Sequence, residues 1–147
     1  MPIIAFDPGE TVGVCIMLDD GTPQALEQIK FPALVKFLKT IKAEKLDTVV
    51  IEKYIVFKGK AMAHTGTDLK TSQSVGQIKM WAELNDLPVV EQTANLLPMA
   101  EKRTQVKIPK DHSASHAICA YLHGAWYLME QGKMLSALEK EYKDRQG

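Results

Sequence analysis

The chain has 147 residues, 46% of them hydrophobic and 24% charged, and its formal net charge is zero. This length predicts a single domain, residues 1–147, with a substantial buried core, and the balanced charge alone gives no indication of a nucleic-acid partner. No apolar run reaches the roughly 20 residues that a membrane span requires, and Asp7 interrupts any early signal-peptide core, which predicts a cytoplasmic protein with no membrane partner.

The N-terminal half reads as a series of strands followed by a helix. Apolar runs separated by turn residues predict strands at 2–7, 12–18, 25–30 and 48–52. Pro32 and the helical spacing of the residues after it predict a helix from 32 to about 44. The first of these strands ends on Asp7, before a Pro-Gly turn, and the last ends on Glu52.

The C-terminal half alternates predicted helices with one strand. Residues 53–67 read as a loop, and the expected elements after it are a helix at 69–85, a strand at 87–91, a short helix within 95–107, a helix from Asp111 to about Glu130 and a helical tail at 137–147. This order predicts an α/β fold in which an antiparallel meander continues into parallel strands. A right-handed crossover would then bring the strand ending on Glu52 beside the strand ending on Asp7.

Two carboxylates at neighbouring strand ends suit a divalent cation. Hard cations such as Mg²⁺ take oxygen ligands from several chain segments, so Asp7 and Glu52 are the first candidate metal ligands. Acidic residues predominate in residues 1–30 and lysines in residues 53–80, an arrangement compatible with phosphate binding near an acidic site. An ordinary solvated lysine face explains the second stretch equally well.

Several motifs in chain order resemble one family. They are Ile4-Ala5-Phe6-Asp7-Pro8-Gly9 with Gly13 in the next strand, Val50-Ile51-Glu52-Lys53, Thr71 to Gln77, Leu87-Pro88-Val89, Ala100-Glu101-Lys102, and Ser113 to Ala120. A lone Asp-Pro-Gly is a common turn, but the whole set is similar to the RuvC-type Holliday junction resolvases of the RNase H-like superfamily. The short chain resembles a compact phage or viral form.

The resemblance implies a fold, a reaction and an assembly. The fold would be RNase H-like, with a mixed five-stranded sheet and helices on both faces. The activity would be a metal-dependent endodeoxyribonuclease that resolves four-way or branched DNA junctions, acting as a homodimer on two opposed strands. Four metal-binding residues would hold Mg²⁺ or Mn²⁺ in a two-metal site, and Asp7 and Glu52 carry over directly as the first two.

The last two ligands of the family do not carry over directly. The family presents Asp-x-x-Asp or His-x-x-Asp near the start of its last core helix. One alignment places His116 at the final aspartate and Ser113 at the earlier position, whereas the other places Cys119 at the final one. We expect Asp111 and His116 to be the helix-borne ligands, with His112 as the substitute because residues 112 and 116 would share a helix face.

The missing carboxylate leaves three interpretations open. The chain is a natural histidine variant, an inactivated copy or an engineered form. A histidine ligand would favour Mn²⁺ relative to Mg²⁺, because imidazole is softer than carboxylate. His64 and His123 are not expected to be ligands, since His64 lies in the loop and His123 lies two helical turns beyond His116.

Basic and aromatic residues complete the predicted site. Lys102, in the matching Ala-Glu-Lys segment, would stabilise charge or position the scissile phosphate. The resemblance implies that an aromatic residue after Glu52 would stack on bases exposed at the junction centre. The candidate DNA contacts are Lys53, Tyr54, Phe57, Lys58, Lys60, Lys70, Lys102 and Arg103. Packing within the loop is an equal alternative for the two aromatic residues.

Two other functions remain compatible with the sequence. A monomeric RNase H-like nuclease of the YqgF type, which acts in ribosomal RNA processing, also begins with a strand and Asp-Pro-Gly. A junction-binding protein without cleavage activity would explain the missing carboxylate. The helix at 69–85, which contains Gly76, is the expected dimer interface and favours the resolvase over the first alternative.

Overall fold

Five strands form one mixed sheet in the order β3-β2-β1-β4-β5. The computed structural model describes residues 1–55, 66–111 and 113–147, with backbone only for 66–68. The strands are β1 (Ile3–Asp7), β2 (Thr11–Met17), β3 (Pro23–Lys30), β4 (Val49–Glu52) and β5 (Val89–Gln92). β1, β2 and β3 form an antiparallel meander, and β4 and β5 continue the sheet in parallel with β1. The predicted mixed five-stranded sheet is confirmed.

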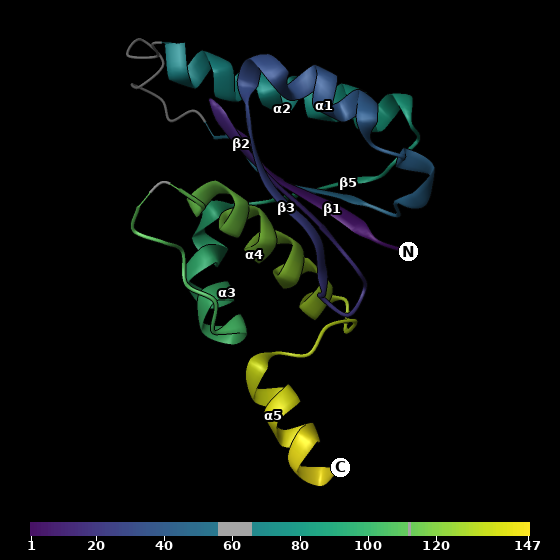
Figure 1. Ribbon diagram of the computed structural model, residues 1–147, viewed down its shortest axis with the longest axis vertical. Helices are drawn as coiled ribbons and strands as arrows, with labels where there is room; N and C mark the ends of the chain where they lie inside the picture. Colours follow the sequence, from purple (N-terminus) through teal and green to yellow (C-terminus); the bar gives the residue numbers. More distant parts are fainter. Residues whose placement is uncertain (56–65, 112) are drawn as a thin grey trace.

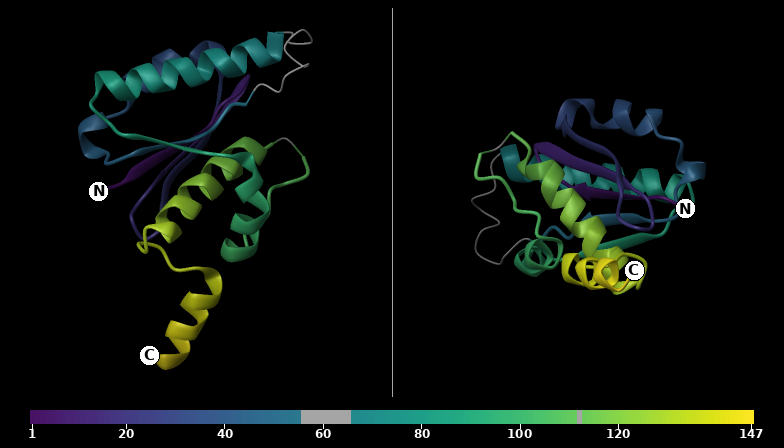
Figure 2. Two further views of the ribbon diagram at one scale, coloured as in Figure 1. Left: turned by 180° about the vertical axis from the view of Figure 1, so that it is seen from behind. Right: turned by 60° about the horizontal axis from the view of Figure 1, so that its bottom comes forward.

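Helices cover both faces of the sheet, as predicted. α1 (Leu34–Thr40) and α2 (Gly66–Leu84) lie on one face, and α4 (Ser115–Glu130) lies on the other with α3 (Leu97–Thr104) beside it (Figure 1). The reverse view shows the same layers (Figure 2). α5 (Ala137–Gln146) extends away from the rest of the molecule and has no buried residue. Short 3-10 turns, η1 (Phe31–Ala33), η2 (Ala43–Lys45) and η4 (Ala94–Leu96), complete the described elements.

The central strand β1 is buried on both faces, and its alternation decides which way Asp7 points. Ile4 and Phe6 pack with the helices α1 and α2, whereas Ile3 and Ala5 belong to the core beneath α4. Because successive side chains of a strand point to opposite faces, Asp7 follows Ile3 and Ala5 onto the α4 face. In β4, Glu52 follows Val50 onto the same face.

Two helix boundaries differ from those expected. The first helix ends at Thr40, and a 3-10 turn replaces its predicted last residues. α4 begins at Ser115, because the backbone N–H and hydroxyl of Ser113 both donate to Asp111 Oδ1 and form a turn before the helix. The expected sharing of a helix face by residues 112 and 116 stays a prediction, because residue 112 lies outside the described residues.

The start of α4 is docked on the sheet through Gly13 and Gln28. A Cβ at Gly13 would lie 1.8 Å from the carbonyl oxygen of His116, so only glycine permits this approach. Gln28 Oε1 accepts hydrogen bonds from the N–H groups of His116 and Ala117, at 2.9 and 3.1 Å. Gln28 Nε2 donates to the carbonyl of Ser113 at 3.2 Å. A side chain of β3 thus satisfies helix N–H groups that have no partner within α4.

Replacing Gly13 by alanine should displace the start of α4. Because the added Cβ meets backbone rather than a movable side chain, we expect Gly13→Ala to lower the free energy of unfolding by about 2 kcal/mol or more. Urea unfolding followed by circular dichroism measures the change. Gly76→Ala is the matched control, since nothing lies within 4 Å of its added Cβ and it should raise helix stability by up to about 1 kcal/mol. Equal effects of the two substitutions would contradict the docking role of Gly13.

Candidate active site

One row of residues across the sheet faces α4. The strand register pairs Gln28 with Gly13, Gly13 with Asp7, and Glu52 with Gln92. Asp7 and Glu52 each follow the paired residues Phe6 and Ile51 of neighbouring parallel strands, so they lie side by side at the strand ends. The prediction that the crossover brings these two carboxylates together is confirmed.

Asp7 is largely buried and contacts the first histidine of α4. Its Oδ2 lies 3.1 Å from His116 Nδ1. Burial raises the pKa of Asp7 above its ordinary value of 3.8, and the nearby charge of Glu52 raises this pKa further, while the hydrogen bond with His116 lowers it. A cation placed between Asp7 and Glu52 would offset both the burial of the Asp7 carboxylate and its repulsion by Glu52.

His116 is the more accessible partner of this pair. Its side chain is 37% exposed. The hydrogen bond with Asp7 raises the pKa of His116 above its ordinary value of 6.5, while partial burial lowers it. At neutral pH, His116 therefore has a greater tendency to carry a proton beside the two carboxylates than a free histidine would.

Glu52 contacts the second histidine of α4. His123 is fully buried, and its Nε2 lies 2.8 Å from Glu52 Oε2. Its Nδ1 lies 3.2 Å from Gln92 Nε2. Sequence reasoning set His123 aside, although its spacing of seven residues from His116 corresponds to two helical turns and so to the same face of α4. That spacing was the signal that could have placed His123 at this site.

The other ligand positions considered on the sequence lie around this helix. Asp111 precedes α4 in the turn with Ser113, and its role as a ligand stays a prediction. Cys119, a free cysteine one turn after His116, is half-buried. Burial raises the pKa of the Cys119 thiol to about 12, and the charges of Asp7 and Glu52 act in the same direction. His116, rather than Cys119, is the residue that contacts Asp7.

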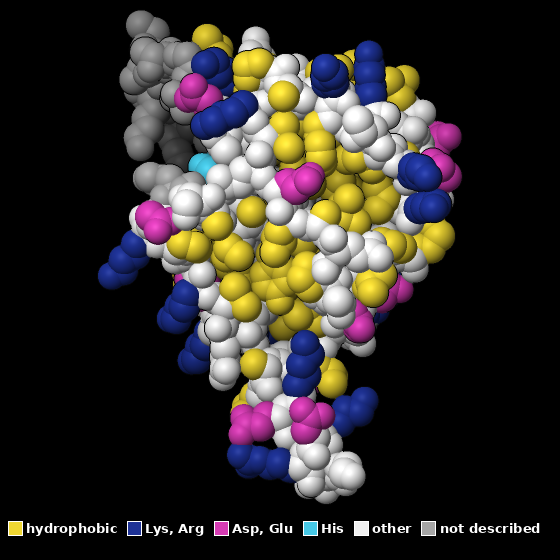
Figure 3. Space-filling model, in the orientation of Figure 1, with side chains coloured by type: hydrophobic (Ala, Val, Ile, Leu, Met, Phe, Trp, Pro, Cys, Tyr) yellow, Lys and Arg dark blue, Asp and Glu magenta, His cyan; other side chains and the backbone are white. Residues whose placement is uncertain are grey.

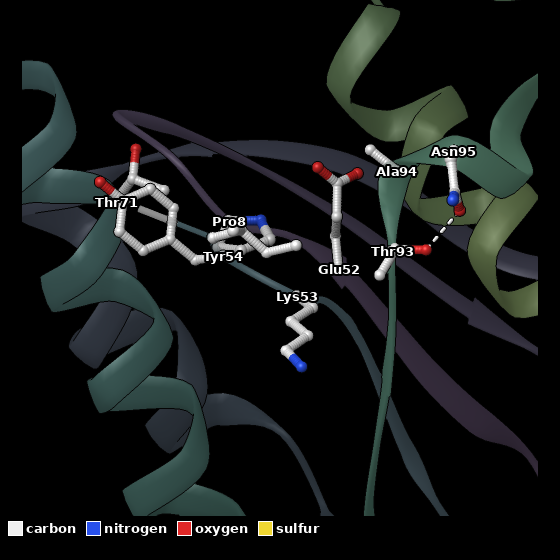
Figure 4. A pocket seen from close by; sticks show the side chains of 9 residues that line it. Pro8, Glu52, Lys53, Tyr54, Thr71, Thr93, Ala94 and Asn95 are labelled. Atoms are coloured by element: carbon white, nitrogen blue, oxygen red, sulfur yellow. Dashed lines mark hydrogen bonds between the residues drawn. The ribbon is translucent and has the colours of Figure 1, made fainter. Parts of the chain in front are cut away.

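A cavity of about 390 Å³ opens beside Glu52. Tyr54, Thr71 and Asn95 are among the residues that line it, and the Glu52 carboxylate lies between Tyr54 and Asn95 (Figure 4). Lys53 extends away from that carboxylate in the same view. The cavity therefore places an aromatic ring, hydroxyl groups and an amide group beside Glu52.

Those predicted DNA contacts that the structure describes do not form one cluster. Lys70 pairs with Glu10 at 3.2 Å near the strand ends, whereas Arg103 pairs with Glu130 at 2.9 Å and lies over the ring of Trp126. Lys102 is exposed on α3. Three further candidates, Phe57, Lys58 and Lys60, lie outside the described residues. Basic and acidic side chains are interspersed on the face shown in Figure 3.

Lys30 is a basic residue near the site that sequence reasoning missed. Its Nζ donates to Thr11 Oγ1 at 3.0 Å, at the end of the β2–β3 ladder. Its positive charge lowers the pKa of His116, which places it within electrostatic reach of the Asp7–His116 pair. Lys30 thus adds a cation on the opposite side of the site from Lys53.

The donor set suits a cation that is held jointly with a substrate. Among the residues that the structure describes, no three His, Cys, Asp or Glu side chains form a ready metal cluster. Mg²⁺ commonly binds through one or two carboxylates together with substrate phosphates, rather than in an all-protein cage. The neighbouring carboxylates of Asp7, which is buried, and Glu52, which is partly exposed, fit that mode. No helix in the described part of the chain is long and apolar enough to cross a membrane.

Comparison with known proteins identifies the fold. No family model and no curated protein matches this chain. The structure is similar to that of Thermus thermophilus RuvC in complex with a Holliday junction substrate, with a TM-score of 0.63, and to a second Thermus thermophilus RuvC structure, with a TM-score of 0.59. Each similarity covers 92% of this chain and 99% of the other, at 12% sequence identity. The chain therefore has the RuvC-like RNase H fold that its motifs predicted.

Replacing Asp7 by asparagine tests whether the pKa values of Asp7 and His116 are both raised in the folded protein. The raised pKa of Asp7 destabilises the folded protein as pH rises above 3.8. The raised pKa of His116 contributes stability that is present below pH 6.5 and is lost as pH rises through the raised value. Asp7→Asn removes both effects, so we expect it to increase the free energy of unfolding, and to do so more at about pH 8 than at about pH 5.5.

Urea unfolding at these two pH values measures the difference. Asp47→Asn is the control, because Asp47 is an exposed carboxylate 3.9 Å from Lys133 and should change stability by less than about 1 kcal/mol at either pH. A destabilising effect of Asp7→Asn, or one that does not grow with pH, would show that the assigned pKa directions are wrong.

Proposed function

We propose that this protein is a structure-selective endodeoxyribonuclease that cleaves four-way or otherwise branched DNA junctions by hydrolysing a phosphodiester bond. The observation that carries the proposal is the pair of carboxylates, Asp7 and Glu52, side by side at the ends of two parallel strands and faced by His116. The fold it shares with RuvC, one structure of which is in complex with a Holliday junction substrate, supports the same function.

Asp7, Glu52 and His116 are the residues that would hold Mg²⁺ or Mn²⁺, with Asp111 and His112 as the further predicted ligands. Two such cations, when bound, would supply an activated water and stabilise the charge on the leaving 3′-oxygen. Asp7, which is buried, and Glu52, which is partly exposed, would provide the negative charge that selects a cation, and a cation between them would relieve the repulsion of Asp7 by Glu52. His116, if present as a ligand, would favour Mn²⁺ over Mg²⁺.

A protonated His116 cannot ligate a cation, so in that form it would instead offer a proton near the reacting phosphate. Its raised pKa and partial exposure allow the protonated ring to face a DNA phosphate while its Nδ1 contacts Asp7. Lys30 and Lys70, which contact the adjacent residues Thr11 and Glu10, would bind flanking phosphates. Phosphate contacts carry most of the affinity when a protein recognises DNA by its shape.

The cavity beside Glu52 provides a place for bases at the junction centre. Tyr54 lines it and would stack on an unpaired base, which is easier to open at a branch point than within a duplex. Lys53 and Lys102 remain candidates for phosphate contacts, and Arg103 is the weakest candidate because it already pairs with Glu130 and Trp126. Phe57, Lys58 and Lys60 remain predictions of the sequence.

A homodimer would present two such sites to two opposed strands. The exposed apolar residues of α2 support this assembly: Met80 and Leu84 are 61% and 75% exposed, and nothing lies within 4 Å of a Cβ added at Gly76. Large apolar side chains gathered on one helix are typical of protein interfaces. A dimer would also favour the junction resolvase over a monomeric YqgF-type nuclease. The resolvase would act in the cytoplasm of a bacterium or phage-infected cell.

A junction-binding protein without cleavage activity is the second candidate. The observation that favours it is that His116 lies against Asp7 where the family pattern expects an acidic residue.

Cleavage of a synthetic four-way junction tests the proposed function. With Mg²⁺ or Mn²⁺, we expect the wild-type protein to cut two opposed strands, and Asp7→Asn and Glu52→Gln to bind the junction while cutting at least about 100-fold more slowly. His116→Ala should also cut more slowly, and a wild-type rate for it would remove His116 from the site. Denaturing gels measure cleavage, and native gels measure binding.

Asp144→Asn is the control for these variants, because it removes an exposed carboxylate on α5, away from the sheet. It should cut at the wild-type rate. Binding by the wild-type protein without cleavage under either cation would support the non-cleaving candidate, and the absence of junction binding would exclude both.

Substitution on α2 tests the dimer. We expect the wild-type protein to be dimeric by light scattering and Met80→Glu to be monomeric, because a buried unpaired carboxylate is strongly unfavourable at an apolar interface. Leu138→Glu, on α5, changes an equally exposed apolar residue and should remain dimeric. A monomeric wild-type protein would instead favour the YqgF-type alternative.

A further inference from the structure

His123 is a buried histidine with a polar partner at each ring nitrogen. No part of it is exposed to solvent. Its Nε2 lies 2.8 Å from Glu52 Oε2, and its Nδ1 lies 3.2 Å from Gln92 Nε2. The same Gln92 nitrogen donates to the backbone carbonyl of His123 at 2.9 Å. Gln92 and Glu52 are paired residues of β5 and β4, so adjacent strands hold both ends of the ring.

These contacts assign the position of the imidazole proton. The carbonyl oxygen of His123 can only accept, so the amide group of Gln92 must present its nitrogen, and not its oxygen, to His123. The second hydrogen of that nitrogen then points to Nδ1, which must accept it. A neutral imidazole with Nδ1 as acceptor carries its proton on Nε2, and it donates that proton to Glu52.

We propose that His123 is a positioning residue, which Gln92 locks as an Nε2–H donor so that it holds the Glu52 carboxylate in the orientation needed for cation binding. The consequence for catalysis rests on the proposed nuclease function. A ring whose Nε2 carries a proton cannot ligate a cation through that atom, so His123 acts through Glu52. The hydrogen bond engages Oε2 and restricts the rotation of a side chain that would otherwise be mobile at a strand end.

The contacts of Gln92 with His123 and of His123 with Glu52 are similar to those behind the ligands of many metal sites. Hydrogen-bonded groups behind a ligand fix its orientation, and their loss typically reduces metal affinity or activity by about 10- to 100-fold. The two histidines of α4 differ in burial. His116 is partly exposed and can meet a substrate, whereas His123 is enclosed and contacts Glu52 and Gln92 among the described residues. His123 therefore needs no contact with DNA to affect the reaction.

The proton assignment is tested without metal or DNA. In the metal-free protein, ¹⁵N-detected NMR of the histidine side chains should show His123 with a protonated Nε2 and an unprotonated Nδ1. Gln92→Met removes the locking amide at similar volume, and we expect it to yield a mixture of tautomers. A wild-type His123 with its proton on Nδ1 would overturn the proposal directly.

Mn²⁺ affinity of the protein bound to a non-cleavable four-way junction, measured by calorimetry, tests the effect on Glu52. We expect His123→Leu to weaken Mn²⁺ binding about 10-fold or more, and His123→Gln, which retains a donor where Nε2 lies, to remain within about threefold of the wild type. Gln92→Met keeps the histidine packing intact and should weaken binding by an intermediate amount, so the proposal is decided even if His123→Leu does not fold. Glu91→Gln is the matched control on β5, since Glu91 pairs with Lys79 and should leave affinity unchanged.

Junction cleavage by the same variants separates positioning from substrate binding. His123→Leu and Gln92→Met should lower kcat and leave KM for the junction unchanged, and added Mn²⁺ should recover part of the lost rate. Wild-type Mn²⁺ affinity in folded His123→Leu or in Gln92→Met would overturn the role of His123. A wild-type protein that binds Mn²⁺ but does not cut would overturn the proposed function alone, and one that binds no Mn²⁺ would overturn both.

Discussion

The docking of α4 onto one row of the sheet is the constraint on which the site depends. Gly13 removes the side chain that would keep the helix away, and Gln28 binds the helix N–H groups that this approach brings within reach. The two carboxylates of the same row, Asp7 and Glu52, then meet the two histidines that α4 presents at a spacing of two turns. Helix position, rather than any single ion pair, is what makes two separate histidine–carboxylate contacts possible.

The two contacts differ in their electrostatic character because they differ in burial. Asp7 loses solvation and lies beside another carboxylate, and both effects raise its pKa, so His116 only partly compensates its charge. Glu52 is held by a ring that is itself fixed from behind by Gln92. One contact is accessible and can exchange its proton with substrate or solvent, whereas the other is enclosed. A site with one adaptable and one rigid carboxylate is well suited to gaining and releasing a cation with its substrate.

The sequence predicted the fold and the acidic pair well, because both depend on short-range patterns. Alternating apolar residues ending on Asp7 and Glu52, together with right-handed crossover, are sufficient to place two strand ends side by side. The start of α4 was predicted four residues too early, since the turn made by Asp111 and Ser113 competes with the helix. The roles of Gln28 and Gln92 could not be predicted, because each contacts a residue far away in the chain. The helical spacing from His116 could have placed His123 on the same face of α4, but it could not have predicted the contacts of His123 with Glu52 and Gln92.

The row of residues that faces α4 includes one member from every strand, edge strands included. A partly paired sheet therefore lacks part of this row. If β5 has not joined β4, Gln92 is missing behind His123. If β3 has not joined β2, Gln28 is missing from the start of α4. Parallel pairing between distant segments is the slow part of folding such a sheet. The complete row, with Gln28 on the start of α4 and Gln92 behind His123, therefore forms only once both edge strands have joined the sheet.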